Sequence, residues 1–263
     1  HYLEEGEVPS RKPRDITLRS RPELTSGEPF FKGCLSSIPE SVRARKHIVD
    51  PPKGPTSLVC CKTTMGPMSI AVHHAWAPIG AARFMDMVRD NFIGPPGLAL
   101  FRALKGFLVQ FGLHSDPTVQ TEWHRRGNLV DDTSWVPLGP DNRERNGIKR
   151  FQKGYMAYAG GGKNSRGTQL IMALEDNGPL GGGSPWEVPF GEVVGDVSME
   201  ALSNINCEYG ENVHQSKIMN RGADYLREFP RLDYWEECRV TFDNQPYDYP
   251  DRPPQRKKKK KTA

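Results

Sequence analysis

Two stretches decide the fold of this chain: residues 100–112, LFRALKGFLVQFG, and residues 155–174, YMAYAGGGKNSRGTQLIMAL. Both hold short apolar runs that are broken by glycine, a pattern typical of buried strands joined by tight turns. Outward from them, residues 57–61, 67–72 and 192–194 are also short and apolar. The sequence therefore predicts many short strands.

Residues 75–92 have the periodicity of a helix, because their apolar side chains recur every three or four positions. Pro78 fits the first turn of this helix, where no N–H donor is needed. Residues 198–205 predict a short second helix with Ser198 as its N-cap. Many short strands with two helices indicate a mainly all-β fold, either a barrel or a sandwich.

Composition divides the 263-residue chain, which is 36% hydrophobic, into three parts. Residues 1–55 are rich in Pro, Arg, Glu and Ser, which predicts a disordered or stalk-like leader. Residues 56–242 form the folded domain, within which residues 114–153 are a long polar loop. Residues 243–263 form a proline-rich tail that contains five consecutive lysines. One core with two polar ends is therefore expected.

The net charge of +4 comes from the tail. The last twelve residues carry seven positive charges and no negative one, which leaves a net charge of −3 for residues 1–251. Nucleic acid is therefore not an expected partner of the folded domain. The lysines at 257–261 could still contact anionic lipid or RNA, or act as an address signal, but a solubilising tail is the simpler interpretation.

Cysteines and hydropathy leave the location of the protein open. Five cysteines are an odd number, and a chain of this length does not need a disulfide framework, so reduced thiols are favoured. No stretch approaches the roughly 20 apolar residues that cross a bilayer. Because the first residue is His1, a signal or membrane tether can lie upstream, so both the cytoplasm and the secretory pathway remain open.

The common covalent, metal-dependent and phosphate-dependent chemistries lack a site. Residues 159–168 suggest a phosphate-binding loop, but Asn164 follows Lys163 where Ser or Thr is needed, and Ala157 replaces the first glycine. The adjacent histidines at 73–74 and the adjacent cysteines at 60–61 point to opposite faces of a strand, so neither pair can ligate one metal. No cofactor or metal is expected, and the domain should act by shape and hydrogen bonding.

Four ordered segments resemble the cyclophilin family of peptidyl-prolyl cis-trans isomerases. The most specific features are Phe-Arg, then five residues, then Leu-Val-Gln, followed later by Gly-Thr-Gln. The segments are residues 76–92, 100–112, 155–174 and 188–194. The chain is also similar to a divergent branch that carries Phe-Gly-Glu-Val-Val at 190–194, Tyr-Gly-Glu at 209–211 and Phe-Pro-Arg-Leu-Asp-Tyr at 229–234.

The resemblance implies a closed eight-stranded antiparallel barrel that is capped by two helices. It also implies isomerisation of X-Pro bonds in proline-containing peptides or unfolded protein clients by a monomer, in support of protein folding. Arg102 matches the catalytic arginine of the family. The substrate-binding positions fall on Phe107, Leu108 and Ile171 as an apolar floor, on Gln110, which should bond the peptide and orient Arg102, and on Ala157 and Gln169 as groove lining.

Simpler interpretations exist for the same residues. Arg102 could form an ordinary surface salt bridge, and residues 107–110 could be an alternating strand with apolar side chains inside. Simple packing explains Ala157 and Gln169 nearly as well.

The chain departs from the family pattern around this site. Ile171 replaces an aromatic ring, Glu187 stands at the family's histidine position, and the family's tryptophan position falls in the glycine run at 181–183. Trp186 could swing into the space of that tryptophan. Reduced activity and weak binding of the family's cyclic-peptide inhibitors are therefore expected. A binding module for proline peptides with decayed catalysis is the alternative function.

Overall fold

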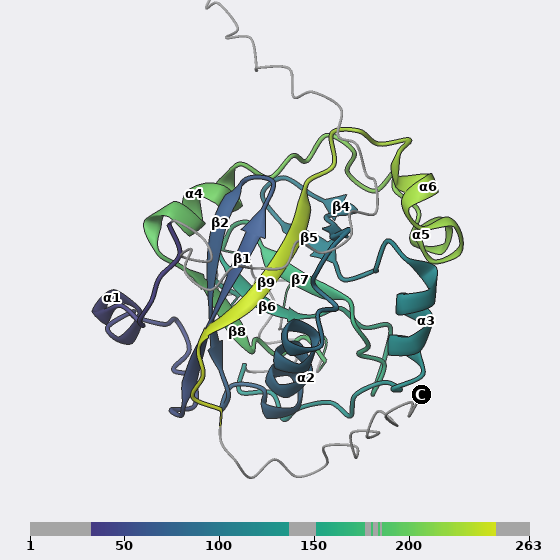
Figure 1. Cartoon of the computed structure of the whole chain (residues 1–263). Coiled ribbons are helices and arrows are strands. Elements are labelled where there is room, and N and C mark those ends of the chain that lie inside the picture. The colour runs from purple at the N-terminus through teal and green to yellow at the C-terminus, as the bar shows by residue number, and fades with distance from the viewer. Residues whose placement is uncertain (1–32, 137–150, 177–179, 181–183, 185, 246–263) are drawn as a thin grey trace, which may run out of the picture.

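The computed structural model of the chain describes residues 33–136, 151–176, 180, 184 and 186–245. Nine antiparallel strands form one curled sheet in the order β3-β9-β1-β2-β8-β6-β7-β5-β4 (Figure 1). The strands are β1 (Thr56–Thr63), β2 (Gly66–His73), β3 (Leu98–Ala99), β4 (Arg102–Ala103), β5 (Leu108–Phe111), β6 (Tyr155–Tyr158), β7 (Leu170–Ala173), β8 (Gly191–Val194) and β9 (Tyr234–Phe242).

The sheet closes into a barrel through residues 98–103. β3 and β4 are the two ends of this segment, and β3 pairs with β9 while β4 pairs with β5. A further bridge between Leu98 and His114 joins the same two edges of the sheet. With residues 98–103 counted as one interrupted strand, the sheet has eight strands, which agrees with the antiparallel barrel that the family resemblance implies.

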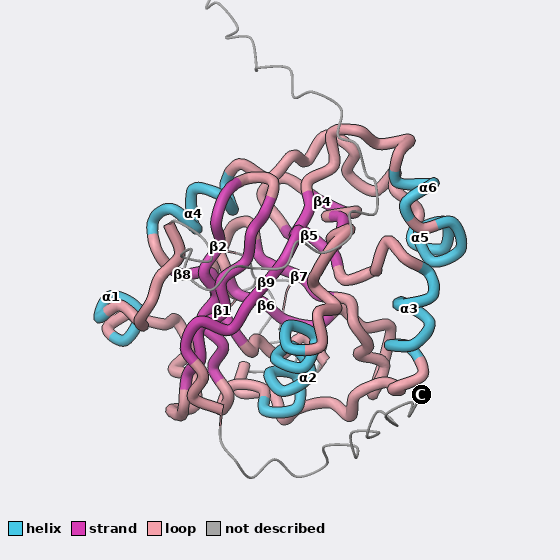
Figure 2. The backbone as a smooth tube through the Cα atoms, in the orientation of Figure 1, coloured by secondary structure: helices cyan, strands magenta, loops and turns pink. Residues whose placement is uncertain are grey.

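Helices surround the strands, as Figure 2 shows in cyan around magenta. The described helices are α1 (Glu40–Arg43), α2 (Pro78–Arg89), α3 (Pro117–His124), α4 (Asp196–Ser203), α5 (Gln215–Arg221) and α6 (Ala223–Leu226). α2 lies beside β9, and α4 lies beside β2 and β8 toward the other end of the barrel (Figure 1). The two predicted helices correspond to α2 and α4.

The prediction of two helices is incomplete, because six are described. α1, α5 and α6 have four to seven residues, which is too short for a periodic apolar pattern to stand out. α3 lies in the polar loop, and its N-cap is Asp116, whose side chain accepts a hydrogen bond from the N–H of Thr118. The predicted N-cap Ser198 is also wrong. Gly195 caps α4, and the Oγ of Ser198 instead accepts a bond from the N–H of Ser69 at 2.8 Å.

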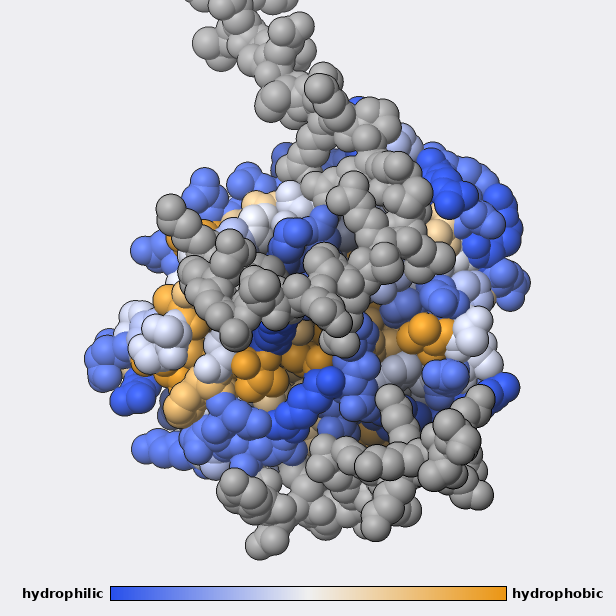
Figure 3. Space-filling view, in the orientation of Figure 1, coloured by the Kyte–Doolittle hydropathy of each residue, from blue (hydrophilic) through white to orange (hydrophobic). Residues whose placement is uncertain are grey.

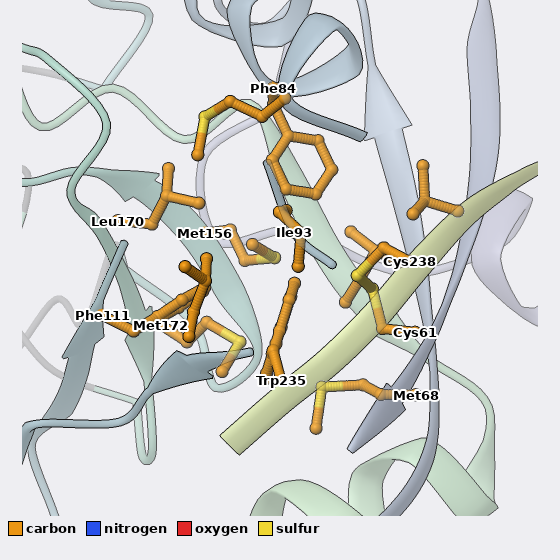
Figure 4. Packing of buried hydrophobic residues seen from close by; sticks show 14 of the residues in the cluster. Cys61, Met68, Phe84, Ile93, Phe111, Met156, Leu170, Met172, Trp235 and Cys238 are labelled. Carbon is orange, nitrogen blue, oxygen red and sulfur yellow. A yellow bond between two sulfur atoms is a disulfide. The ribbon is translucent and has the colours of Figure 1, made fainter. Parts of the chain in front are cut away.

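The barrel interior is filled by apolar side chains from every wall. Trp235 of β9, Phe84 of α2 and Phe111 of β5 are fully buried, and Met156 and Leu170 pack between them (Figure 4). Burial of such side chains stabilises a fold by roughly 1.5 to 3 kcal/mol each. This core fixes the strands on which the site residues stand.

Disulfides correct the expectation of reduced thiols. Cys61 of β1 faces the core and bonds Cys238, its cross-strand partner on β9 (Figure 4). Cys60 points to the opposite face and bonds Cys34. Cys207 is the free cysteine. The expectation rested on the odd number of cysteines, but one free cysteine leaves four that can pair. Because Cys60 and Cys61 face opposite sides of β1, each reaches a separate partner.

Residues 33–55, which we call the strap, pack against the outside of the barrel although they belong to the predicted leader. The Cys34–Cys60 disulfide ties the strap to β1, and the N–H of Leu35 donates to Ser69 Oγ at 3.0 Å. Its apolar side chains cover three outward-facing barrel residues; the contacts are Leu35, Ile38 and Val42 on Leu58, Ala71 and Val194. In Figure 3, orange hydrophobic surface lies on the left, beside the place of α1. No helix of the described residues is long and apolar enough to span a bilayer.

Candidate active site

The outer face of β4, β5, β7 and β6 carries the predicted site residues. Side chains alternate along a strand. On β5, Val109 and Phe111 point into the core, so Leu108 and Gln110 point outward. The same alternation on the neighbouring strands gives this face an apolar and a polar part.

Four of the predicted residues form one row across four strands. Arg102 of β4 pairs with Gln110 of β5, Gln110 pairs with Ile171 of β7, and Ile171 pairs with Ala157 of β6. Side chains of directly opposed residues lie about 4.5 to 5.5 Å apart at Cβ. The structure therefore brings together residues that are up to 69 positions apart in the sequence, with the guanidinium at one end of the row and the small alanine at the other.

The apolar floor beside this row is largely covered. Leu108 and Ile171 are each 3% exposed, and Leu180, which is 4% exposed, belongs to the same cluster. Phe107 is half-buried against that cluster. A wall of aromatic side chains continues the cluster away from Arg102; its members are Trp76, Trp135, Phe151 and Tyr155.

Gln110 and Gln169 bond each other. The side-chain amide of Gln110 donates from Nε2 to Gln169 Oε1 at 2.7 Å. The bond sets the two glutamines side by side, and the role of both as lining of a peptide groove stays a prediction. The predicted orienting bond from Gln110 to Arg102 is not among the hydrogen bonds between described residues, since the amide is turned toward β7.

Arg102 is held from the other side by a residue that the sequence did not single out. Its Nε and Nη2 both donate to Oε1 of Glu211, at 2.8 and 2.6 Å. The side chain of Arg102 is 28% exposed and that of Glu211 is 63% exposed, so the pair lies at the surface. The simpler interpretation of Arg102 as a salt-bridge arginine is thus present in the structure together with its place in the row.

Trp186 packs against the glycine loop, residues 159–168, which follows β6. A Cβ atom added at Gly160 would fall 2.6 Å from Cδ1 of Trp186, so only glycine lets the ring approach so closely. The indole N–H of Trp186 is buried and has no hydrogen-bond partner among the described residues. Glu187 is half-buried, and its N–H donates to the carbonyl of Ser184 at 3.0 Å.

The glycine loop is anchored by an ion pair that the sequence analysis missed. Arg166 is fully buried, and its Nη1 donates to Oδ2 of Asp132 at 2.8 Å. The same carboxylate accepts from the N–H groups of Ile79 and Gly80 at the start of α2. The loop that resembled a phosphate cradle therefore connects β6 to β7 and is tied to the start of α2 through the Asp132 carboxylate.

A second missed group lies where the strap meets the barrel. Glu192 of β8 is fully buried, and its carboxylate accepts from Nη1 of Arg45 and pairs with Nε2 of His73 at 3.0 Å. Burial alone would raise the pKa of the Glu192 carboxyl, but the His73 hydrogen bond and the Arg45 charge outweigh burial and hold that pKa below its ordinary value. A charged residue inside the apolar run at 190–194 was the available signal, because a buried carboxylate needs partners.

The strap also touches the aromatic wall. Nδ1 of His47 hydrogen-bonds the hydroxyl of Tyr155, and its ring meets Trp76 edge-on at 5.4 Å between ring centres. Trp76 also stacks on His73 at 3.9 Å. The described residues contain no group of three side chains that could hold a metal ion.

The family model described as cyclophilin type peptidyl-prolyl cis-trans isomerase/CLD matches residues 58–222. A solved structure of a Cryptosporidium parvum cyclophilin type peptidyl-prolyl cis-trans isomerase is 16% identical, with a TM-score of 0.46 over 70% of this chain and 97% of that one. A structure of the same protein in the presence of the dipeptide Ala-Pro is also 16% identical, with a TM-score of 0.45 over 70% of this chain and 98% of that one. No curated protein matches the chain.

Proposed function

The chain belongs to the cyclophilin-type peptidyl-prolyl cis-trans isomerase family, and from that premise we propose that it isomerises X-Pro bonds in flexible or unfolded protein clients with Arg102 as the catalytic residue. Amide resonance sets a barrier of about 18 to 20 kcal/mol, while the cis and trans forms of an X-Pro bond differ by only about 1 kcal/mol. No covalent bond is made or broken. A catalyst therefore needs only to bind the twisted amide more tightly than either planar form.

A guanidinium suits this task. It can donate to the carbonyl oxygen of the prolyl peptide and also offer an N–H to the prolyl nitrogen, whose lone pair becomes available only when resonance is lost. The bond to Glu211 uses Nε and Nη2 of Arg102, so the Nη1 end of the guanidinium lies outside that pair. This end is the part that we assign to the substrate.

The observation that carries the proposal is the row Arg102–Gln110–Ile171–Ala157 across β4, β5, β7 and β6. It sets a fixed cation beside an apolar strip, which is the arrangement that a proline ring and its preceding carbonyl require. Phe107 and Leu108 extend the apolar strip, and the Gln110–Gln169 pair supplies polar groups for the peptide backbone.

Replacement of Arg102 by Ala tests the assignment. We expect kcat/KM for a proline-containing tetrapeptide to fall at least about tenfold, which corresponds to about 1.4 kcal/mol of transition-state stabilisation. The matched control is Arg221→Ala, which removes another surface arginine that pairs with a glutamate, Glu228, at 2.9 Å. An unchanged rate in Arg102→Ala would refute the catalytic role.

A second function, binding of proline peptides without efficient catalysis, is favoured by one specific observation. The floor residues Leu108 and Ile171 are almost fully buried, and Leu180 packs into the same cluster, so a proline ring must displace neighbouring side chains to reach them. Ile171 also supplies a branched chain where the family has an aromatic ring. NMR separates the two functions, since an isomerase produces cis–trans exchange peaks in the peptide whereas a pure binder only shifts its resonances.

A further inference from the structure

We propose that Glu211 is a positioning residue for isomerisation, which orients the guanidinium of Arg102 so that its Nη1 end faces the substrate. The proposal rests on the assignment of Arg102 as the catalytic residue. It adds to that assignment a carboxylate that lies 109 positions away in the sequence, in the turn between α4 and α5.

The contact geometry determines the orientation of the guanidinium. One oxygen of Glu211 accepts from both Nε and Nη2 of Arg102, so it binds one edge of the planar group. Two bonds to one edge fix the rotation of the side chain as well as its position, because the five N–H groups of arginine form a rigid fork. The opposite edge then has a defined direction.

The backbone around Glu211 is itself fixed to the site strand. The N–H of Ala103, the residue after Arg102, donates to the carbonyl of Gly210 at 3.3 Å and forms a bridge between β4 and this turn. Gly210 has a φ of 53°, a left-handed conformation that glycine adopts without strain. Tyr209 packs edge-on against Phe229 at 5.2 Å between ring centres. Two consecutive residues of β4 are thus matched to two consecutive residues of the turn.

A role in stability alone does not account for this arrangement. Both side chains are partly exposed, and exposed ion pairs contribute little to folding because water and salt screen them. An arginine side chain loses considerable rotamer freedom when it is held in one geometry. Because Glu211 restricts the side chain before the substrate binds, less entropy is lost when the guanidinium donates to the twisted amide.

Three variants at one position test the proposal. Glu211→Ala should lower kcat/KM about threefold to fivefold, which corresponds to about 0.7 to 1 kcal/mol at 1.4 kcal/mol per tenfold. Glu211→Gln keeps an acceptor oxygen in place and should retain more than half of the activity. Glu228→Ala breaks another exposed arginine–glutamate pair, Arg221–Glu228, and should leave kcat/KM unchanged.

NMR adds a readout that does not depend on turnover. The Nε–H resonance of Arg102, assigned by its loss in Arg102→Lys, should be sharp in the wild type and in Glu211→Gln and should broaden in Glu211→Ala. Wild-type kcat/KM should also fall toward that of Glu211→Ala as salt rises to about 1 M, since salt screens exposed pairs.

The outcomes separate this proposal from the assignment of Arg102. If Arg102→Ala loses activity while Glu211→Ala equals or exceeds the wild type, the positioning role is wrong and the catalytic role stands. If Arg102→Ala keeps full activity, the catalytic role fails first. Loss of activity in Glu211→Gln equal to that in Glu211→Ala would also overturn positioning by hydrogen bonding.

Discussion

Two charged groups on the outside of this barrel occupy opposite environments. The cluster of Arg45, Glu192 and His73 lies under the strap, and its carboxylate is fully buried. The pair of Arg102 and Glu211 lies at the surface, where the glutamate is 63% exposed. Both use an arginine and a glutamate, so the difference between them comes from solvent access.

Solvent access decides what each group can contribute. A buried carboxylate that loses a partner is left without water, so removal of one partner is strongly destabilising. An exposed pair exchanges its bonds with water at little cost, so its loss changes stability by about 0 to 1 kcal/mol. We therefore infer that the buried cluster holds the strap on the barrel, and that the exposed pair is part of the proposed site.

The largest expected effect comes from release of the strap at its covalent end. Cys34→Ser removes the disulfide to Cys60, and loss of a cross-link that closes a loop of this size typically costs about 3 kcal/mol. Urea unfolding should give that decrease, while Cys207→Ser, which removes the free cysteine, should change stability little. Thiol counts on unfolded protein without reductant should be one for the wild type and two for Cys34→Ser. A wild-type count of five would contradict both disulfides.

The next effect comes from the buried cluster itself. Arg45→Ala leaves the Glu192 carboxylate with His73 alone and should lower the unfolding free energy by about 2 kcal/mol. The value lies below that of a fully buried pair because the Arg45 side chain is 26% exposed. A double variant, Arg45→Met with Glu192→Gln, removes both charges and should recover part of the loss. A change below about 0.5 kcal/mol in Arg45→Ala would remove the distinction between the two groups.

Acid should weaken the strap side of the barrel in two stages. Burial lowers the pKa of His74 to about 4 and also lowers the pKa of His47. Between about pH 6.5 and 4 the unfolded imidazoles bind protons that the folded ones do not, so stability falls as pH falls. The second stage follows as pH drops through the lowered pKa of Glu192.

Urea unfolding at intervals from pH 7 to 4 measures the first stage. His74→Gln replaces an imidazole whose Nε2 hydrogen-bonds Ser57 Oγ at 2.8 Å with a group that does not titrate. Its stability should depend less steeply on pH than that of the wild type. An equal slope for the two proteins would exclude His74 as a source of the effect.

The smallest expected effect on stability belongs to the exposed pair. Arg102→Ala and Glu211→Ala should each change the unfolding free energy by less than about 1 kcal/mol. Each should nevertheless lower isomerase activity. These two variants should therefore lose activity with little loss of stability, whereas Arg45→Ala should mainly lose stability. Parallel urea unfolding and peptide assays on the three variants measure this contrast. Equal destabilisation by Arg45→Ala and Arg102→Ala would remove it.

Local sequence pattern predicted most of the strands and the helices α2 and α4, but it missed β9, the longest strand. The short apolar runs correspond to β1, β2 and β5 to β8, and the helical periodicity of residues 75–92 corresponds to α2. These features are readable because neighbouring residues determine them.

Pattern was less informative where a contact depends on a distant residue. Three partners that the sequence did not indicate lie far away along the chain. Glu211 is 109 positions from Arg102, Arg45 is 147 positions from Glu192, and Cys238 is 177 positions from Cys61. Residues 33–55 have the composition of a leader, yet a disulfide, three apolar side chains and several hydrogen bonds attach them to the barrel. Amino-acid composition cannot predict such contacts, because each one joins a single residue to a surface formed by residues that are distant in the sequence.

The sequence by itself determined the family resemblance and, through it, the expected barrel and the candidate arginine, because ordered motifs are written in consecutive residues. Strand periodicity alone left a barrel and a sandwich open. Only the tertiary structure decided which carboxylate meets which guanidinium, which cysteines pair and how far the floor of the site is covered. The reason is physical. Register and closure of the barrel set the distances between remote residues, and those distances, together with burial, fix the strength of every charged or covalent contact.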